Sequence, residues 1–284
     1  MRFISYSAAA EQGVGIKSEG GYRGLPVSQL GGDLRSFLGQ ESGLADLAKL
    51  LQGAPEFALT DVTLLPPVTR PEKILCIGLN YRSHTQESGF EVPDYPAVFA
   101  RFANGLVAHG APLVRPNASA LLDYECELAV VIGKDGRHIA RHDALGHVAG
   151  YSLFNDGSVR DFQTKSQQWT MGKAFDATGA FGPELVTPDE LPDGCRGLRI
   201  RTILNGEVMQ DADTEDMIFG VAELIAVLSE AMTLAPGDVI VTGTPDGIGA
   251  FRDPQVWLRP GDVCTVEIER IGTLTNPVVQ EPAE

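Results

Sequence analysis

The sequence is poor in positive charge. Its 284 residues include 22 Lys and Arg against 38 Asp and Glu, which gives a formal net charge of -16 at pH 7. A surface of that sign repels nucleic acid and anionic lipid, so we expect neither as a partner. The hydrophobic fraction of 43% is sufficient for a large core, and small molecules remain as the expected class of partner.

Long apolar runs and paired cysteines are also missing. No window approaches the roughly 20 apolar residues of a membrane-spanning helix, and the opening segment MRFISYSAAAEQ is not typical of a signal peptide. The four cysteines, Cys76, Cys126, Cys195 and Cys264, show no C-x-x-C spacing. This predicts reduced, structural thiols rather than a zinc site or a disulfide framework. We therefore expect a cytoplasmic protein that does not enter membranes.

The pattern of the first residues predicts a small α+β module over 1–69. Short β-like pieces alternate with Gly-rich turns, and one amphipathic helix is predicted from about Ser42. The segment LLPPVTRPEK contains three prolines, which favour a stiff extended connector, and we place the domain boundary there.

Residues 70–284 are predicted to form a second, mainly β domain. One long amphipathic helix, from about Thr214 to Met232, interrupts a series of β-like segments. Regular βαβ alternation and a G-x-G-x-x-G fingerprint are both missing from the sequence. This argues against a Rossmann domain or a parallel barrel.

In the segment LLDYECELAVVIG, two carboxylates precede a run of apolar residues. With a period of two, Glu125 and Glu127 fall on one face, about 6.6 Å apart at their Cα atoms, while Tyr124, Cys126 and Leu128 fall on the other. Like charges at that separation repel each other, so a positive group is expected between them. The alternative is that the strand end emerges into water and both glutamates are solvated.

Two loops at strand ends contain further reactive groups. In NYRSHTQESG, His84 and Glu87 stand three residues apart on a short predicted helix that a glycine ends. A carboxylate in that position orients an imidazole, although a solvated surface turn explains the same pattern. In FNDGSVRDFQ, a helical turn after the glycine would place Asp156, Arg160 and Gln163 on one face. An ordinary surface salt bridge between the first two of these residues is the alternative.

Two other segments combine glycine with polar groups. In QWTMGKAFD, Lys173 follows Gly172 in an unusually apolar neighbourhood for a lysine. In VIVTGTPDGIG, a β run ends in Gly243 and Thr244, whose backbone N–H groups and hydroxyl suit an anion. The segment lacks the lysine and the spacing of a P-loop, so nucleotide binding is not expected.

Taken in order along the chain, these segments resemble the fumarylacetoacetate hydrolase family. The resemblance extends from about Pro71 to the C-terminus through KILCIGLNYRSHTQESG, DYECELAVVIG, FNDGSVRDFQ, GKAFDATGAFGPELVT, LNGEVMQDADTEDMIF and PGDVIVTGTPDGIG. It implies a mainly β (α+β) protein, in which a small, variable N-terminal module is followed along the chain by a mixed β-sandwich roll. It also implies a homodimer with one Mg²⁺ or Mn²⁺ in each subunit.

The resemblance assigns roles to individual residues. Three carboxylates would bind the metal, and such hard oxygen donors suit Mg²⁺ or Mn²⁺. The implied metal ligands are Glu125, Glu127 and Asp156; the catalytic residues are His84, Glu87 and Lys173; and the substrate-binding residues are Tyr81, Arg82, Arg160, Gln163, Gly243 and Thr244. His84 with Glu87 would activate a water, and Lys173 would stabilise negative charge that develops on oxygen.

The implied reaction is hydrolysis of a C–C bond in a 2,4-dioxo acid, with release of pyruvate. The substrate would be an acylpyruvate, a diketo-deoxy sugar acid or a fumarylpyruvate-type acid. The alternatives on the same scaffold are decarboxylation of an oxaloacetate-like acid and isomerisation or hydration of a dienoic acid. A silent metal-binding scaffold is a further alternative, although it gives His84, Glu87 and Lys173 no reason to occur together. Gly157 and Val159 depart from the family pattern, so their loop is expected to be looser than usual.

Overall fold

The N-terminal part of the computed structural model, which describes residues 1–283, is a small α+β module. It contains strands β1 (Arg2–Ala8), β2 (Glu11–Ser18), β3 (Gly21–Pro26), β4 (Glu56–Phe57) and β5 (Thr63–Leu65), and helices α1 (Val27–Leu30), α2 (Leu34–Leu38) and α3 (Gly43–Gln52). Helix α3 is the one expected from Ser42, which is its N-cap residue. Its buried side chains Leu47 and Leu51 face the core of the module.

The remaining chain is mixed α+β and mostly strands, as predicted. Its strands are β6 (Ile74–Gly78), β7 (Ala97–Arg101), β8 (Leu106–Val107), β9 (Leu113–Arg115), β10 (Leu122–Asp123), β11 (Cys126–Ile132), β12 (Val148–Asp156), β13 (Ser158–Val159), β14 (Gly179–Val186), β15 (Arg199–Leu204), β16 (Glu207–Asp213), β17 (Val239–Val241), β18 (Val263–Ile268) and β19 (Gly272–Gln280). Its helices are α4 (Arg82–Ser88), α5 (Arg160–Gln163), α6 (Thr170–Lys173) and α7 (Val221–Ala231).

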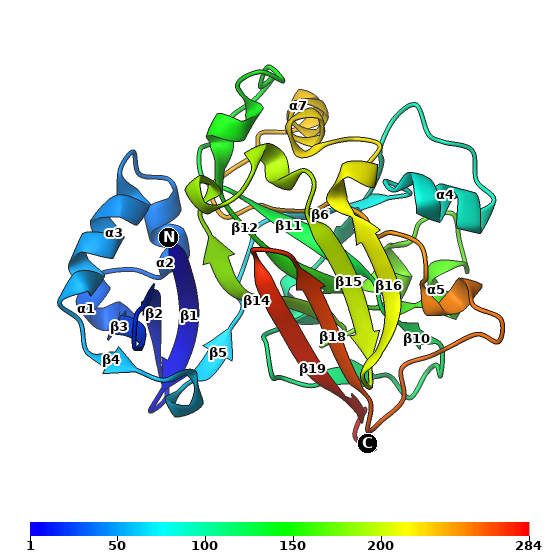
Figure 1. The fold of residues 1–284 in the computed structure, drawn as a ribbon, viewed down its shortest axis with the longest axis horizontal. Coiled ribbons are helices and arrows are strands. Elements are labelled where there is room, and N and C mark those ends of the chain that lie inside the picture. The colour runs from blue at the N-terminus through cyan, green and yellow to red at the C-terminus, as the bar shows by residue number, and fades with distance from the viewer. Residues whose placement is uncertain (284) are drawn as a thin grey trace.

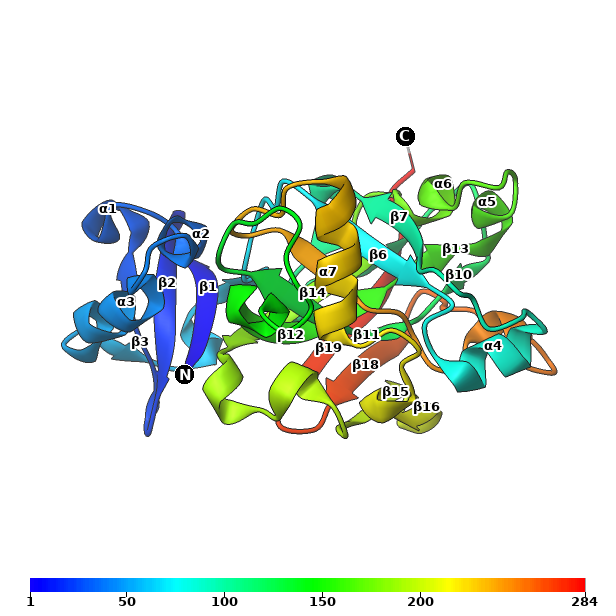
Figure 2. The ribbon, with the colours of Figure 1, turned by 90° about the horizontal axis from the view of Figure 1, so that it is seen from above.

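Most strands belong to one long sheet of 12 strands, which is mainly antiparallel. Its order is β4-β3-β2-β1-β14-β12-β11-β17-β6-β7, with β5 paired to β1 and β8 to β14. A second sheet, of order β16-β15-β18-β19-β9, packs on one face of the first. Figure 1 shows the N-terminal module at one end and helices α4 and α5 at the other, and Figure 2 shows the same separation from above.

The N-terminal module shares this sheet with the rest of the chain. Strand β1 pairs with β14 in antiparallel register, with Phe3 opposite Leu185. The module is therefore joined to the second part by backbone hydrogen bonds as well as by the connector. The division into 1–69 and 70–284 stays a prediction, because one sheet crosses the proposed boundary.

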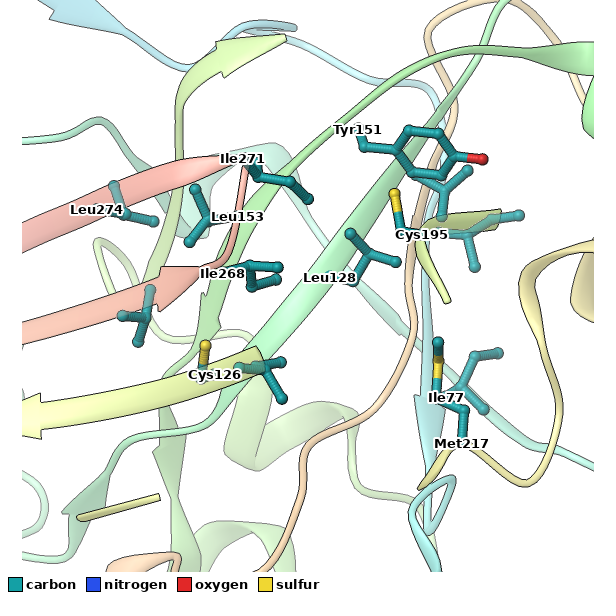
Figure 3. Packing of buried hydrophobic residues seen from close by; sticks show 14 of the residues in the cluster. Ile77, Cys126, Leu128, Tyr151, Leu153, Cys195, Met217, Ile268, Ile271 and Leu274 are labelled. Carbon is teal, nitrogen blue, oxygen red and sulfur yellow. The ribbon is translucent and has the colours of Figure 1, made fainter. Parts of the chain in front are cut away.

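Strand β11 separates two parts of the core, as its alternation predicted. Cys126, Leu128 and the neighbouring Tyr124 pack into the larger core between the two sheets, which Figure 3 shows from close by. Ala129 and Val131 face the other way, into the core that the N-terminal module completes. All four cysteines are buried and free, as expected for structural thiols.

The helix predicted from Thr214 is shorter than expected. Residues Thr214–Asp216 form a single 3-10 turn, and α7 begins only at Val221. The reason lies in a distant residue: the Asn80 side chain accepts a hydrogen bond from the Phe219 backbone N–H at 2.8 Å, which holds this segment extended. Among residues 1–283, no helix is long and apolar enough to cross a membrane.

Candidate active site

Three buried carboxylates meet where β11 begins and β12 ends. The backbone N–H of Asp156 donates to the carbonyl of Glu125 at 2.9 Å, which sets the two residues side by side. One carboxylate oxygen from each of Glu125, Glu127 and Asp156 lies within 4.8 Å of the others. The three residues are only 5%, 2% and 0% exposed. The alternative in which both glutamates are solvated is therefore wrong.

Three cations surround two of these carboxylates. The ammonium of Lys173 donates to Glu125 at 2.6 Å and to Asp156 at 2.5 Å. The guanidinium of Arg101 donates to the other oxygen of Asp156 at 2.6 Å. Arg160 places its Nη2 2.7 Å from the second oxygen of Glu125. A positive group was predicted near the two glutamates, and the structure places three there, each from a separate segment.

Glu127 lacks such a partner. Its carboxylate accepts a hydrogen bond from the backbone N–H of Gly243, and no Lys, Arg or His forms an ion pair with it among residues 1–283. Burial, together with repulsion from Asp156 and Glu125, raises the pKa of Glu127 well above its usual value. Burial opposes ionisation of Glu125 too, but Lys173 and other cations outweigh it and lower that pKa to about 2. Glu127 is therefore the carboxylate of the three for which ionisation is least favourable without a further positive charge.

Lys173 is held in the site by a close approach of two short helices. A Cβ on Gly172 would lie 2.4 Å from the backbone nitrogen of Gln163, so only glycine lets α6 pack this tightly on α5. Burial alone would lower the pKa of Lys173, but Asp156 and Glu125 raise it. The lysine is therefore a fixed ammonium at the bottom of the site, and its apolar sequence neighbourhood reflects burial.

The helical turn predicted after Gly157 is only partly correct. Asp156 ends a strand, and the turn begins at Arg160, so these side chains do not share a helix face. Arg160 donates to Asp123 at 2.8 Å and to Gln163 at 2.9 Å instead of pairing with Asp156. The surface salt bridge that was the alternative is also wrong, because both side chains are inside the protein.

The loop between Asp156 and Arg160 is held by strand pairing and by a hydrogen bond from Arg101. Ser158 and Val159 form β13, which pairs with β10, and both are buried. The Arg101 guanidinium donates to the carbonyl of Gly157 at 2.9 Å. These contacts hold the backbone of the loop, and the expectation that it is looser than in other family members stays a prediction.

His84 and Glu87 form the predicted pair on α4, which ends at a glycine in the left-handed conformation. His84 Nδ1 lies 3.3 Å from one oxygen of Glu87. The other oxygen accepts a hydrogen bond from the backbone N–H of Gly247 at 3.0 Å, so the carboxylate is fixed between two partners. His84 is buried, which is incompatible with a solvated surface turn.

The segment VIVTGTPDGIG does bind anions through its backbone N–H groups, and these anions are carboxylates of the chain itself. Gly247 holds the glutamate of α4, Gly243 donates to Glu127, and Gly249 donates to Asp123 at 2.8 Å. One loop therefore positions three acidic side chains around the site.

A cavity of 480 Å³ opens above the carboxylates. Most of the predicted site residues line it: His84, Glu125, Glu127, Arg160, Gln163, Lys173 and Thr244. Glu87, Asp156 and Gly243 lie behind this surface and hold lining residues through the contacts described above. The hydroxyl of Thr244 accepts a hydrogen bond from Gln210 at 2.9 Å, which fixes its orientation.

Tyr81 and Arg82 lie outside the lining of this cavity. Tyr81 is fully buried in the larger core. Arg82 turns toward the carbonyls of Asp216 and Met217, at 3.3 and 3.2 Å. The positions of these two residues do not support the predicted substrate contacts.

Sequence reasoning missed two important residues. Asp123 is fully buried and links Arg160 to the backbone of the 243–250 loop. Its signal was present, because it continues the two-residue alternation of Glu125 and Glu127. Arg101 also left a signal, because it is the lone charge within the β-like segment AVFARF, but nothing in the sequence pointed to Asp156 as its partner.

The carboxylate cluster fits a divalent cation. Its donors are three oxygens without histidine or cysteine, which suits Mg²⁺ or Mn²⁺ better than zinc. An ion at this position would supply the positive charge that Glu127 lacks and would favour its ionised form. The geometry therefore supports the predicted ligand set, and which ion it takes remains a proposal.

Comparisons with known proteins agree with this description. A human protein named oxaloacetate tautomerase FAHD2A, mitochondrial, is 43% identical over 250 residues, which are 87% of this chain and 79% of the relative. The Bacillus subtilis oxaloacetate tautomerase YisK is 42% identical over 231 residues, or 80% of this chain and 76% of the relative.

Solved structures give the same result. A fumarylacetoacetate hydrolase from Exiguobacterium antarcticum superposes with a TM-score of 0.86 at 32% identity and covers 99% of this chain and 100% of its own. A maleylpyruvate hydrolase from Sphingobium sp. SYK-6, in complex with manganese(II) and pyruvate, gives 0.83 at 27% identity with the same coverage. The family described as fumarylacetoacetate (FAA) hydrolase C-terminal matches residues 73–279. The chain is therefore an enzyme of the fumarylacetoacetate hydrolase family.

Proposed function

We propose that the protein catalyses keto–enol tautomerisation of oxaloacetate or a close 2-oxo acid. One observation supports this most strongly: an imidazole oriented by a carboxylate and a buried ammonium line the same cavity as the metal-type carboxylates. Tautomerisation needs a base for a C–H proton and positive charge near the enolate oxygen. The human and Bacillus relatives are named for this reaction.

His84 is the proposed proton carrier. Its Nδ1 faces Glu87, so a neutral imidazole that donates from Nδ1 leaves the lone pair of Nε2 free. Nε2 takes a proton from C3 of the keto acid, and the resulting imidazolium returns it to the enolate oxygen, so no atom is gained or lost. Glu87 keeps the ring in this tautomer and is itself held by Gly247.

The other site residues bind the 2-oxo acid substrate and stabilise the negative charge that develops on its enolate oxygen. Glu125, Glu127 and Asp156 would hold Mg²⁺ or Mn²⁺, which when bound polarises the 2-oxo group and stabilises negative charge on its oxygen. Lys173 is a fixed positive charge beside that position. Arg160, Gln163 and Thr244 offer donors to the carboxylate of the substrate.

Hydrolysis of a 2,4-dioxo acid to release pyruvate is the second candidate. The same free nitrogen of His84 can remove a proton from water, and the maleylpyruvate hydrolase with bound pyruvate shares the fold. Decarboxylation of oxaloacetate needs no attacking water and is the third. The three reactions differ in the role of the base: in tautomerisation it removes a proton from carbon, in hydrolysis it removes a proton from water, and decarboxylation needs no base.

A panel of substrates separates the candidates. Oxaloacetate is followed by ultraviolet absorbance of the enol and by CO₂ release, and acetylpyruvate by pyruvate release, each with Mg²⁺ or Mn²⁺. We expect acceleration of enol decay, and we expect His84→Ala to lower kcat/KM by roughly 10²–10⁴-fold. His142→Ala is the matched control, because His142 is exposed and outside the cavity. Unchanged enol decay with wild-type protein would refute the proposal.

Two further expectations accompany the function. We propose a homodimer, supported by exposed apolar side chains on and beside the edge strand β7, such as Tyr95, Val98 and Phe102; light scattering after gel filtration tests it. The cytoplasmic location also stays a proposal, because the human relative is named as mitochondrial.

A further inference from the structure

The outer part of the active-site cavity has a different character from its floor. The floor residues Glu127 and Lys173 are both 2% exposed. Five aromatic side chains also line the cavity: Phe90, Phe99, Trp169, Phe251 and Trp257. Phe90 and Phe251 are 57% and 46% exposed. Exposure therefore rises from charged groups at the bottom to aromatic rings at the mouth.

The aromatic rings start next to the proposed reacting groups. The Phe99 ring centroid lies 5.1 Å from the Lys173 ammonium, and Trp169 packs edge-on against Phe99 with centroids 5.7 Å apart. On the other side, the Phe251 and His84 rings are 5.9 Å apart. Two aromatic walls thus lead outward, one from the lysine and one from the histidine.

The Trp169 wall is built into the fold. A Cβ on Gly78 would lie 2.1 Å from the Trp169 ring, so the indole packs directly on the end of β6. Trp169 is half-buried, and it comes from the segment just before α6, which also contributes Lys173. The strand end fixes the ring in place, so this wall is a preformed contact surface.

The aromatic part of the cavity offers no Arg or Lys of the described residues to a carboxylate at the far end of a longer substrate. Among residues 1–283, Arg160 and Lys173 are the only Arg or Lys that line the cavity. Arg160 is engaged by Asp123 and Glu125, and Lys173 by Glu125 and Asp156. A dioic acid longer than oxaloacetate, with a second carboxylate that reaches beyond the floor, would therefore place that carboxylate among aromatic rings, where its desolvation has no compensation.

The cavity is also larger than oxaloacetate requires. Its 480 Å³ falls within the roughly 300–1,000 Å³ typical of sites that enclose drug-sized ligands. A four-carbon acid bound at the carboxylates leaves the aromatic mouth in contact with water, and exposed apolar surface of this kind marks a binding site.

We propose that the aromatic mouth is a subsite for an uncharged aromatic or apolar group attached to the 2-oxo acid. The inference rests on the proposed function, because the floor must bind the 2-oxo acid end. It names the substrate class as 2-oxo acids with an aryl or bulky apolar substituent beyond C3, in addition to small acids such as oxaloacetate.

Three ligands with the same head test the subsite without turnover. Oxamate has no tail, N-oxalylglycine has a carboxylate tail, and N-phenyloxamate has an aromatic tail. Their dissociation constants are measured by calorimetry on the Mg²⁺-loaded protein. We expect N-phenyloxamate to bind about tenfold more tightly than oxamate, and N-oxalylglycine to bind no more tightly than oxamate.

Two variants locate the effect in the mouth. Trp169→Ala and Phe251→Ala should each remove most of the preference for the phenyl tail and leave oxamate affinity unchanged. Phe251→Ala keeps the test valid if the loss of Trp169 disturbs folding. Leu50→Ala is the matched control, because Leu50 is 54% exposed on α3 and does not line the cavity.

The results separate the subsite from the proposed function. Equal affinities for oxamate and N-phenyloxamate, or tighter binding of N-oxalylglycine, would overturn the subsite while the chemistry at the floor stands. Failure of all three ligands to bind would overturn both. A phenyl preference without turnover of oxaloacetate would support the subsite and reject the reaction.

Discussion

Replacing Glu127 with glutamine tests the charge balance of the site directly. The oxygens of Glu127 that face Glu125 and Asp156 lie within 4.8 Å of theirs. At an effective dielectric constant near 20, each such pair of ionised carboxylates repels by about 3.5 kcal/mol, and burial together with this repulsion is the reason that Glu127 resists ionisation. Lys173 offsets part of this repulsion. Because the glutamine side chain keeps an oxygen that accepts from the Gly243 N–H, we expect Glu127→Gln to raise the free energy of unfolding of metal-free protein by about 1–3 kcal/mol.

Glu125→Gln is the matched comparison, two residues away on the same face. Glu125 bonds to Lys173 and contacts Arg160, so its neutralisation leaves two buried cations with less compensation. We expect this variant to lose about 3–5 kcal/mol of unfolding free energy. The two glutamine variants are thus predicted to have effects of opposite sign.

Urea unfolding in EDTA and again with saturating Mg²⁺ measures both effects. Wild-type protein should gain about 2.7 kcal/mol when free Mg²⁺ is roughly 100 times its Kd, whereas Glu127→Gln should gain little. The stabilities of wild type and variant would then converge or cross on addition of metal. Equal or lower stability of Glu127→Gln in EDTA would refute the reasoning.

Three further variants are expected to change stability in the same unfolding assay, and the third also changes ligand binding, which calorimetry measures. Arg101→Leu should cost about 3–5 kcal/mol by leaving Asp156 without its second cation, and Arg101→Lys should cost less; equal losses would contradict this. Burial lowers the pKa of the His109 imidazole from 6.5. As pH falls, the unfolded chain therefore binds a proton at His109 before the folded protein does, and the free energy of unfolding decreases below pH 6.5. His109→Gln should flatten the dependence of this free energy on pH between about pH 6.5 and 5, and an unchanged dependence would reject the assignment. Gly78→Ala should cost about 1–3 kcal/mol and weaken N-phenyloxamate binding by displacing Trp169, but not oxamate binding.

Local patterns were sufficient to predict the carboxylate strand and the short helix of the site. The alternation around Glu125 and Glu127 indicated which residues face the core and which converge. The spacing of His84 and Glu87, followed by a glycine, indicated a helical turn and its end. Both predictions rest on residues within one element, where backbone geometry alone determines which side chains meet.

Contacts between distant segments could not be predicted in this way. Arg101, Asp156 and Lys173 lie on different elements, and only the folded sheet brings them together. The start of α7 was misplaced for the same reason, because Asn80 occupies the backbone N–H of Phe219. Strand β14 was not predicted, because its glycines and proline are typical of loops.

The pairing of β1 with β14 has a consequence for synthesis. The partner of Phe3 is Leu185, more than half the chain later. Ser5–Ser7 on this edge of β1 pair with β5, but Arg2 and Phe3 wait for β14. At roughly 5–20 residues per second, a ribosome leaves that end of the edge unpaired for on the order of ten seconds or more. During that interval this end of β1 is an open template for other chains. We therefore expect the yield of folded protein to depend on nascent-chain chaperones and on the rate of translation, because both affect this unpaired end of β1, which lies far from the active site.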